Sequence, residues 1–203
     1  MTSELATLLG PHRRRSLLLD ANLLLILAIG QFEPLQIERH KKTKGGYRAE
    51  DHGLMVELLG AFTRCLTTPH ILTEVSNQLA QGSGALQYAL FQGFADLTRI
   101  LIEHHVPCCD LVGHDQFHAF GLTDMGILNL AAREEALVIS ADSSLVAFLM
   151  IFDSQNRQFR RTQGRQLLKA LKLCVERPHS SHLPVLRVKT HQEGAPAPDP
   201  AEA

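Results

Sequence analysis

Short apolar runs alternate with longer stretches of helical periodicity along this chain. Three apolar runs of strand length lie at 16–20, 67–72 and 136–140, and a weaker one follows at 185–188. Runs of this kind are typical of strands buried on both faces of a parallel sheet. The helical repeats between and after them predict helices over 21–29, 54–66, 74–79, 85–105, 124–135, 143–152 and 166–176. Strands that alternate with helices predict an α/β fold with a central parallel sheet.

Three segments lack this periodicity. Residues 33–53 carry five Lys and Arg side chains around a Gly-Gly pair and are predicted to form an exposed loop, and a second basic segment spans 157–165. From 190 onward the chain is rich in Pro and Ala and has no apolar repeat, which predicts disorder. The length of 203 residues suits one domain over 1–189, followed by a disordered tail over 190–203.

The composition is that of an ordinary globular protein, with 45% hydrophobic and 20% charged residues. A formal net charge of −1 gives no global basic field, so any nucleic-acid binding has to come from local patches. The four cysteines show no CxxC spacing, and we expect buried free thiols. No apolar run is long enough to cross a membrane, and no signal-peptide cleavage pattern follows the basic start. We therefore expect a soluble, cytoplasmic protein without membrane contact.

One carboxylate interrupts the most apolar stretch, which reads LLLDANLLLIL from Leu17 to Leu27. An ionised Asp20 at the end of a buried strand costs several kcal/mol of desolvation unless a partner compensates it. The carboxyl ends of the strands are also where open α/β sheets bind ligands. Asp20 therefore predicts a cation, a basic side chain or helix-end amides nearby.

Three further acids occupy comparable places. Glu74 begins the helix after the second run, with Thr73 as its N-cap, and Asp142 follows the third run. Asp124 opens the helix 124–135 on its apolar face, with Thr123 as N-cap. Each acid alone also fits a helix cap or a turn. Together they would repel one another unless divalent cations such as Mg²⁺ or Mn²⁺ neutralise them, and such a site suits hydrolysis of a phosphodiester.

The segments LLLDANLLL, TPHILTEV, GLTDMGILNLAAREEALVIS and SADSSL resemble, in this order, the PIN-domain nucleases, which include the toxin ribonucleases of toxin–antitoxin pairs. The resemblance covers roughly residues 16–150 and leaves 151–189 as a C-terminal extension. It implies a three-layer α/β/α domain that cleaves RNA with Mg²⁺ or Mn²⁺. The catalytic, metal-binding residues that it implies are Asp20, Glu74, Asp124 and Asp142, supported by Asn22 and Ser140.

The expected partner is RNA, with a protein antitoxin and a second copy of the chain as further candidates. The basic runs offer phosphate contacts through Arg14, Arg15, Lys41, Lys42, Lys44, Arg160 and Arg161. Aromatic residues make up 5% of the chain and Trp is absent, which favours backbone contacts over base stacking.

Three alternatives stay open at this point. An inactive PIN-like scaffold would bind RNA or a protein, and a DNA nuclease would use the same acids. The eleven histidines also raise the possibility of a histidine metal site, although no HExxH motif is present. His114 and His118 have a spacing of four residues, and Asp110 and Asp115 lie close enough along the chain to join Asp124.

Overall fold

The computed structural model describes residue 7, residues 9–80 and residues 84–155. Its elements follow one another as η1 (Gly10–His12), β1 (Leu17–Leu19), α2 (Ala21–Phe32), α3 (Gln36–Arg39), α4 (Ala49–Gly60), β2 (Cys65–Thr67), α5 (Pro69–Leu79), α6 (Gly84–Ile100), β3 (Ile102–Glu103), α7 (Cys108–Val112), α8 (Phe117–Glu134), β4 (Leu137–Ile139) and α9 (Ser143–Gln155). The predicted α/β fold is confirmed.

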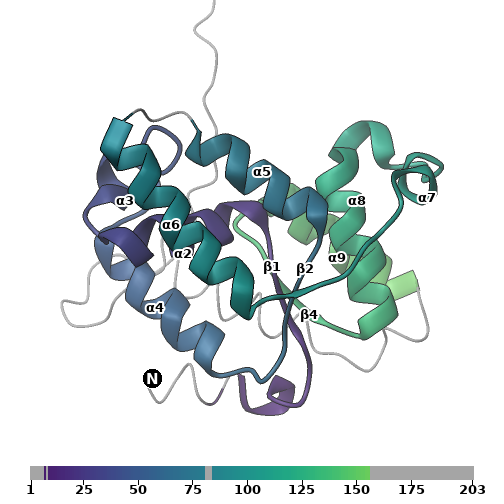
Figure 1. The fold of residues 1–203 in the computed structure, drawn as a ribbon. Coiled ribbons are helices and arrows are strands. Elements are labelled where there is room, and N and C mark those ends of the chain that lie inside the picture. The colour runs from purple at the N-terminus through teal and green to yellow at the C-terminus, as the bar shows by residue number, and fades with distance from the viewer. Residues whose placement is uncertain (1–6, 8, 81–83, 156–203) are drawn as a thin grey trace, which may run out of the picture.

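The four strands form one parallel sheet in the order β3-β2-β1-β4. In the register of the central strand, Leu17 lies between Cys65 of β2 and Leu137 of β4. Figure 1 shows α2, α3, α4 and α6 on one side of the strands, and α7, α8 and α9 on the other. Because all strands run the same way, the connections that follow them start at one common edge, the carboxyl edge of the sheet.

The core is built around β1 and α2. Leu17 and Leu18 are completely buried, and α2 is buried on all sides from Leu23 to Ile29, as expected for a helix that is apolar all round. Helix α6 packs closely on α2 at Gly93, where a Cβ atom would lie 2.9 Å from the carbonyl oxygen of Ala28. The element that follows Asp20 is therefore fixed from several directions.

The second strand and its helix begin earlier than predicted. The predicted strand at 67–72 is wrong, because β2 ends at residue 67 and α5 begins at Pro69. Proline fixes a φ angle that suits the first helical turn, and the side chain of Thr68 accepts a hydrogen bond from a main-chain N–H of that turn. Thr68 is thus the N-cap in place of Thr73, and Glu74 lies inside the helix.

The segment 33–53 is not the exposed loop that its polarity predicts. It contains α3, a series of turns and the start of α4. Ile37 and Thr43 are buried, and the Thr43 hydroxyl donates to the carbonyl oxygen of Ile37 at 2.5 Å. Asp51 is buried as well, but only one of these three buried residues is apolar, which is too few to produce a visible periodicity.

The chain between residues 85 and 135 also departs from the prediction. The predicted helix over 85–105 ends at residue 100, and residues 102–103 form β3, whose side chains are both exposed and so give no alternation. Residues 107–118, which lie between the predicted helices, contain α7. Helix α8 consists of two helical segments that meet at Gly121, whose φ of +72° suits glycine. The segment with Asp124 therefore begins directly after Gly121, and Thr123 lies inside it rather than at its N-cap.

The prediction of buried thiols is correct for Cys65 and wrong for Cys108 and Cys109, which are exposed. Cys174 lies outside the described residues. So do the second basic segment with Arg160 and Arg161, the predicted helix and strand at 166–176 and 185–188, and the tail 190–203. Among the helices that the structure describes, none has the length and apolar character needed to cross a membrane.

Candidate active site

Asp20 lies where β1 passes into α2 and is 3% exposed. Its Oδ1 atom accepts a hydrogen bond from the N–H of Leu23 at 2.8 Å, which makes Asp20 the N-cap of α2. Its Oδ2 atom accepts from the hydroxyl of Ser140 and from the N–H of Ala141, the latter at 2.8 Å. Burial raises the pKa of Asp20 above its ordinary value, although these hydrogen bonds oppose the effect. Of the roughly four acceptor positions of a carboxylate, three are used.

The carboxyl end of β4 supplies the second part of the site. The Ser140 hydroxyl that donates to Asp20 also accepts a hydrogen bond from the N–H of Asp142 at 2.9 Å. Asp142 in turn caps α9, because its Oδ1 atom accepts from the N–H groups of Ser144 at 2.7 Å and of Leu145 at 3.1 Å. Its side chain is exposed. Ser140 therefore links the buried acid of β1 to the exposed acid that follows β4.

Asp124 faces these acids from the interior of α8 and is partly buried. Burial, together with the negative charges of Asp142, Glu74 and Asp20, raises the pKa of Asp124 to about 7. The four acids that the sequence singles out therefore lie close enough for their charges to act on one carboxyl group. They reach this place from four different elements or junctions.

Glu74 approaches from α5, which packs against α8. Its Oε1 atom accepts a hydrogen bond from the side-chain amide of Gln78 at 3.1 Å, one turn further along the helix. Asn22 lies on the first turn of α2 with an exposed side chain. Among the described residues, no side-chain hydrogen bond joins Asn22 to the acids.

The side chains of this site are of the type that binds a divalent cation, but their positions do not form a ready binding group. Carboxylate oxygens are the ligands that Mg²⁺ and Mn²⁺ prefer. Within 9–80 and 84–155, however, no group of three or more His, Cys, Asp or Glu side chains is placed to hold a metal ion. Like charges that share a site repel one another unless a cation lies between them. The alternative ligands have exposed side chains and form no such group either: Asp110, Asp115, His114 and His118.

Sequence reasoning missed Tyr47, which belongs to the predicted loop. Burial raises the pKa of Tyr47 well above its ordinary value, and the carboxylates of Asp20 and Asp51 add to the effect. The phenol therefore lies near Asp20, and the ring packs against the main core. An aromatic residue in an otherwise polar, basic segment was the one available signal.

The basic residues that were expected to bind RNA are divided between two ends of the sheet. Lys41, Lys42 and Lys44 have exposed side chains on the turns that lead to Tyr47. Arg14 and Arg15 precede β1 and so lie toward the amino edge of the sheet, opposite the acids. Because the Tyr47 phenol lies near Asp20, the segment that carries the lysines reaches the edge of the sheet where the acids lie.

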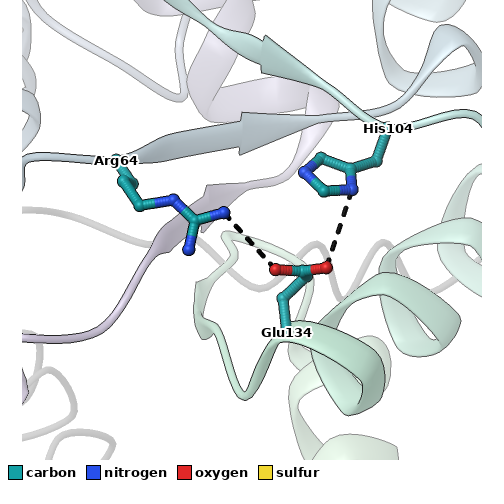
Figure 2. A network of polar contacts seen from close by, with 3 residues as sticks. All are labelled: Arg64, His104 and Glu134. Atoms are coloured by element: carbon teal, nitrogen blue, oxygen red, sulfur yellow. Dashed lines mark hydrogen bonds and ion pairs between the residues drawn. The ribbon is translucent and has the colours of Figure 1, made fainter.

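A polar network fixes the far end of the helix that carries Asp124. Figure 2 shows Glu134, in the last turn of α8, between Arg64 and His104. The Glu134 carboxylate lies 3.4 Å from Nη2 of Arg64 and 3.7 Å from Nδ1 of His104. Partly exposed pairs of this kind contribute about 0–1 kcal/mol each, so the network links the end of α8 to residues next to β2 and β3 but adds little to the stability.

The four acids thus share one edge of the sheet, and their charges act on a single carboxyl group. Comparisons with family models, with curated proteins and with solved structures find no match to this chain.

Proposed function

We propose that this chain is a PIN-like, metal-dependent endoribonuclease that hydrolyses RNA with Asp20, Glu74, Asp124 and Asp142. The observation that carries the proposal is the carboxyl group of Asp124, on which burial and three other acids act. Such a cluster destabilises the folded chain, and a bound divalent cation is the compensation that suits an all-oxygen set. The parallel sheet with helices on both sides is compatible with the three-layer α/β/α arrangement that this proposal includes.

The roles of the acids follow from their surroundings. Asp20, Asp124 and Asp142 would hold Mg²⁺ or Mn²⁺, and Asp20 still has an acceptor position left for this. The cation would activate water and neutralise the leaving oxygen of the phosphodiester. Ser140 keeps the Asp20 carboxylate in one orientation through its hydrogen bond. Glu74, fixed by Gln78, orients the attacking water.

In this proposal the protein contacts RNA through the phosphate groups. The exposed lysines that precede Tyr47 would contact the backbone, and the phenol near Asp20 would then lie beside the nucleotide at the scissile bond. The negative charge of the acids repels RNA, so positive charge at this edge is needed to bring a phosphate to them.

The test is the cleavage of a mixed-sequence single-stranded RNA with Mg²⁺ or Mn²⁺, with and without EDTA. Asp124→Asn is the informative variant, because Asp20→Asn would also remove an acceptor from the cap of α2. Asp115→Asn, with an exposed side chain, is the matched control. We expect EDTA and Asp124→Asn to abolish cleavage and Asp115→Asn to retain it. Wild-type rates in Asp124→Asn would overturn the proposal, and faster cleavage of single-stranded DNA would change its substrate.

A second function is favoured by one observation, the absence of a ready metal-holding group among the described residues. It is a PIN-like scaffold that binds RNA without cleaving it. RNA binding without cleavage, together with no Mg²⁺ or Mn²⁺ binding by calorimetry, would support the scaffold. Binding of the cation that is lost in Asp124→Asn would exclude it.

A further inference from the structure

A thiol and an imidazole meet at the other half of the carboxyl edge, beyond β2 and β3. His70 lies in the first turn of α5, and Cys108 begins α7. The Nε2 atom of His70 lies 3.2 Å from Sγ of Cys108, across 38 residues of sequence. The parallel pairing of β2 with β3 places the starts of the two connections side by side and so creates this contact.

The other side of the imidazole is buried against α8. Its Nδ1 atom is buried and, in the part of the chain that the structure describes, has no hydrogen-bond partner. It faces Gly126 of α8, where an added Cβ atom would lie 3.4 Å from it. Cys108, in contrast, is exposed. The ring thus presents Nε2 to a thiol that solvent and solutes can reach.

The neighbouring cysteine provides an internal comparison. Cys109 is also exposed, but its thiol donates to the carboxylate of Asp110 at 3.5 Å. A carboxylate opposes negative charge on the sulfur, whereas an imidazole can take the thiol proton and then face the thiolate as a cation. Two adjacent, exposed thiols therefore have chemically different neighbours.

We propose that Cys108 is a modification site, a thiol activated by His70 that reacts with peroxide-class oxidants. The thiol proton passes to Nε2 of His70, and the sulfur attacks one oxygen of hydrogen peroxide. The S–O bond forms as the O–O bond breaks, and the departing hydroxide takes the proton from Nε2 of His70 to become water. The sulfur is oxidised by two electrons to sulfenic acid, and the peroxide is reduced. This reaction does not depend on the proposed nuclease activity.

The test measures the reactivity of each thiol in the full chain with EDTA present. Iodoacetamide labelling is followed at the peptide level by mass spectrometry in Cys109→Ser, which reports Cys108, and in Cys108→Ser, which reports Cys109. We expect Cys108 to react at least about fivefold faster than Cys109, because the thiolate is the reacting form. His70→Gln in the Cys109→Ser background should remove this advantage.

Brief treatment with hydrogen peroxide followed by dimedone then locates any sulfenic acid. The expected adduct is on Cys108 and not on Cys109. Equal labelling rates of the two thiols, an unchanged Cys108 rate in His70→Gln, or a dimedone adduct absent from Cys108 would each overturn the proposal. The comparison of the two thiols uses the native His70, so it decides the question even where His70→Gln does not fold.

Discussion

Replacing Asp124 by Asn removes one charge from the acid cluster while keeping the size of the side chain. Because the pKa of Asp124 rises from 3.8 to about 7 on folding, the folded protein keeps this proton in a range of pH where the unfolded chain has lost it. Between these two values the unfolded chain binds fewer protons than the folded one. The free energy of unfolding therefore falls as the pH rises from about 4 to about 7.

The size of the effect follows from the same two pKa values. Their difference corresponds to at most about 4 kcal/mol of lost stability above pH 7. Asp142, one source of the repulsion, is exposed, and solvent screening reduces the expected loss to roughly 2 kcal/mol. Asparagine does not ionise. Relative to the wild type, Asp124→Asn should gain this amount of stability between about pH 3.5 and about pH 8.5, which lie below and above both pKa values.

The assay is urea unfolding with EDTA at both pH values, followed by circular dichroism, for the wild type, Asp124→Asn and Asp115→Asn. Asp115→Asn should follow the wild type at both. A difference between Asp124→Asn and the wild type that does not change with pH would refute the reasoning. Added Mg²⁺ at the higher pH should stabilise the wild type more than Asp124→Asn. A pH effect without a Mg²⁺ effect would support the repulsion among the acids and argue against a bound metal ion.

Two further predictions concern the fold that supports the site. Gly93→Ala should destabilise the protein by roughly 1–3 kcal/mol, because its Cβ atom would lie 2.9 Å from the carbonyl oxygen of Ala28. Gly53→Ala is the matched comparison: it has open space in α4 and should stabilise the protein by about 0.5–1 kcal/mol. Thermal unfolding of both variants checks this, and equal effects would contradict it. Thr68→Ala should lower the free energy of unfolding by about 1 kcal/mol, because it removes the N-cap of α5. Urea unfolding measures this beside the control Thr63→Ala, whose side chain is exposed. Equal stability of the two variants would show that the cap contributes nothing.

The acid of the first strand was predictable because its signal is local. A carboxylate inside a run of leucines needs a polar partner, and the structure supplies Ser140, Ala141 and the first turn of α2. Strands β1 and β4 were predictable for the same reason, since each lies in a continuous apolar run. Of the three predicted kinds of partner for Asp20, the structure confirms the helix-end amides, through the N–H of Leu23.

The remaining features depend on pairings between distant segments. The start of α5 was misplaced because Pro69 fits the start of a strand and the start of a helix equally well, and only the pairing of β2 decides between them. The neighbours of Tyr47 and His70 likewise come from other elements. A polar segment with one aromatic residue has no periodicity from which such contacts could be predicted.

The hydrogen bond from Ser140 to Asp20 joins residues 120 positions apart, and it sets an order of events during synthesis. The ribosome extends the chain from the N-terminus, so Asp20 emerges long before β4 exists. Until residue 140 has left the exit tunnel, β1 lacks one of its two neighbours and the carboxylate lacks its hydroxyl partner. The acids can assemble only when most of the chain has been made. A nascent chain is therefore without its complete acid cluster until residues 140–142 have left the exit tunnel.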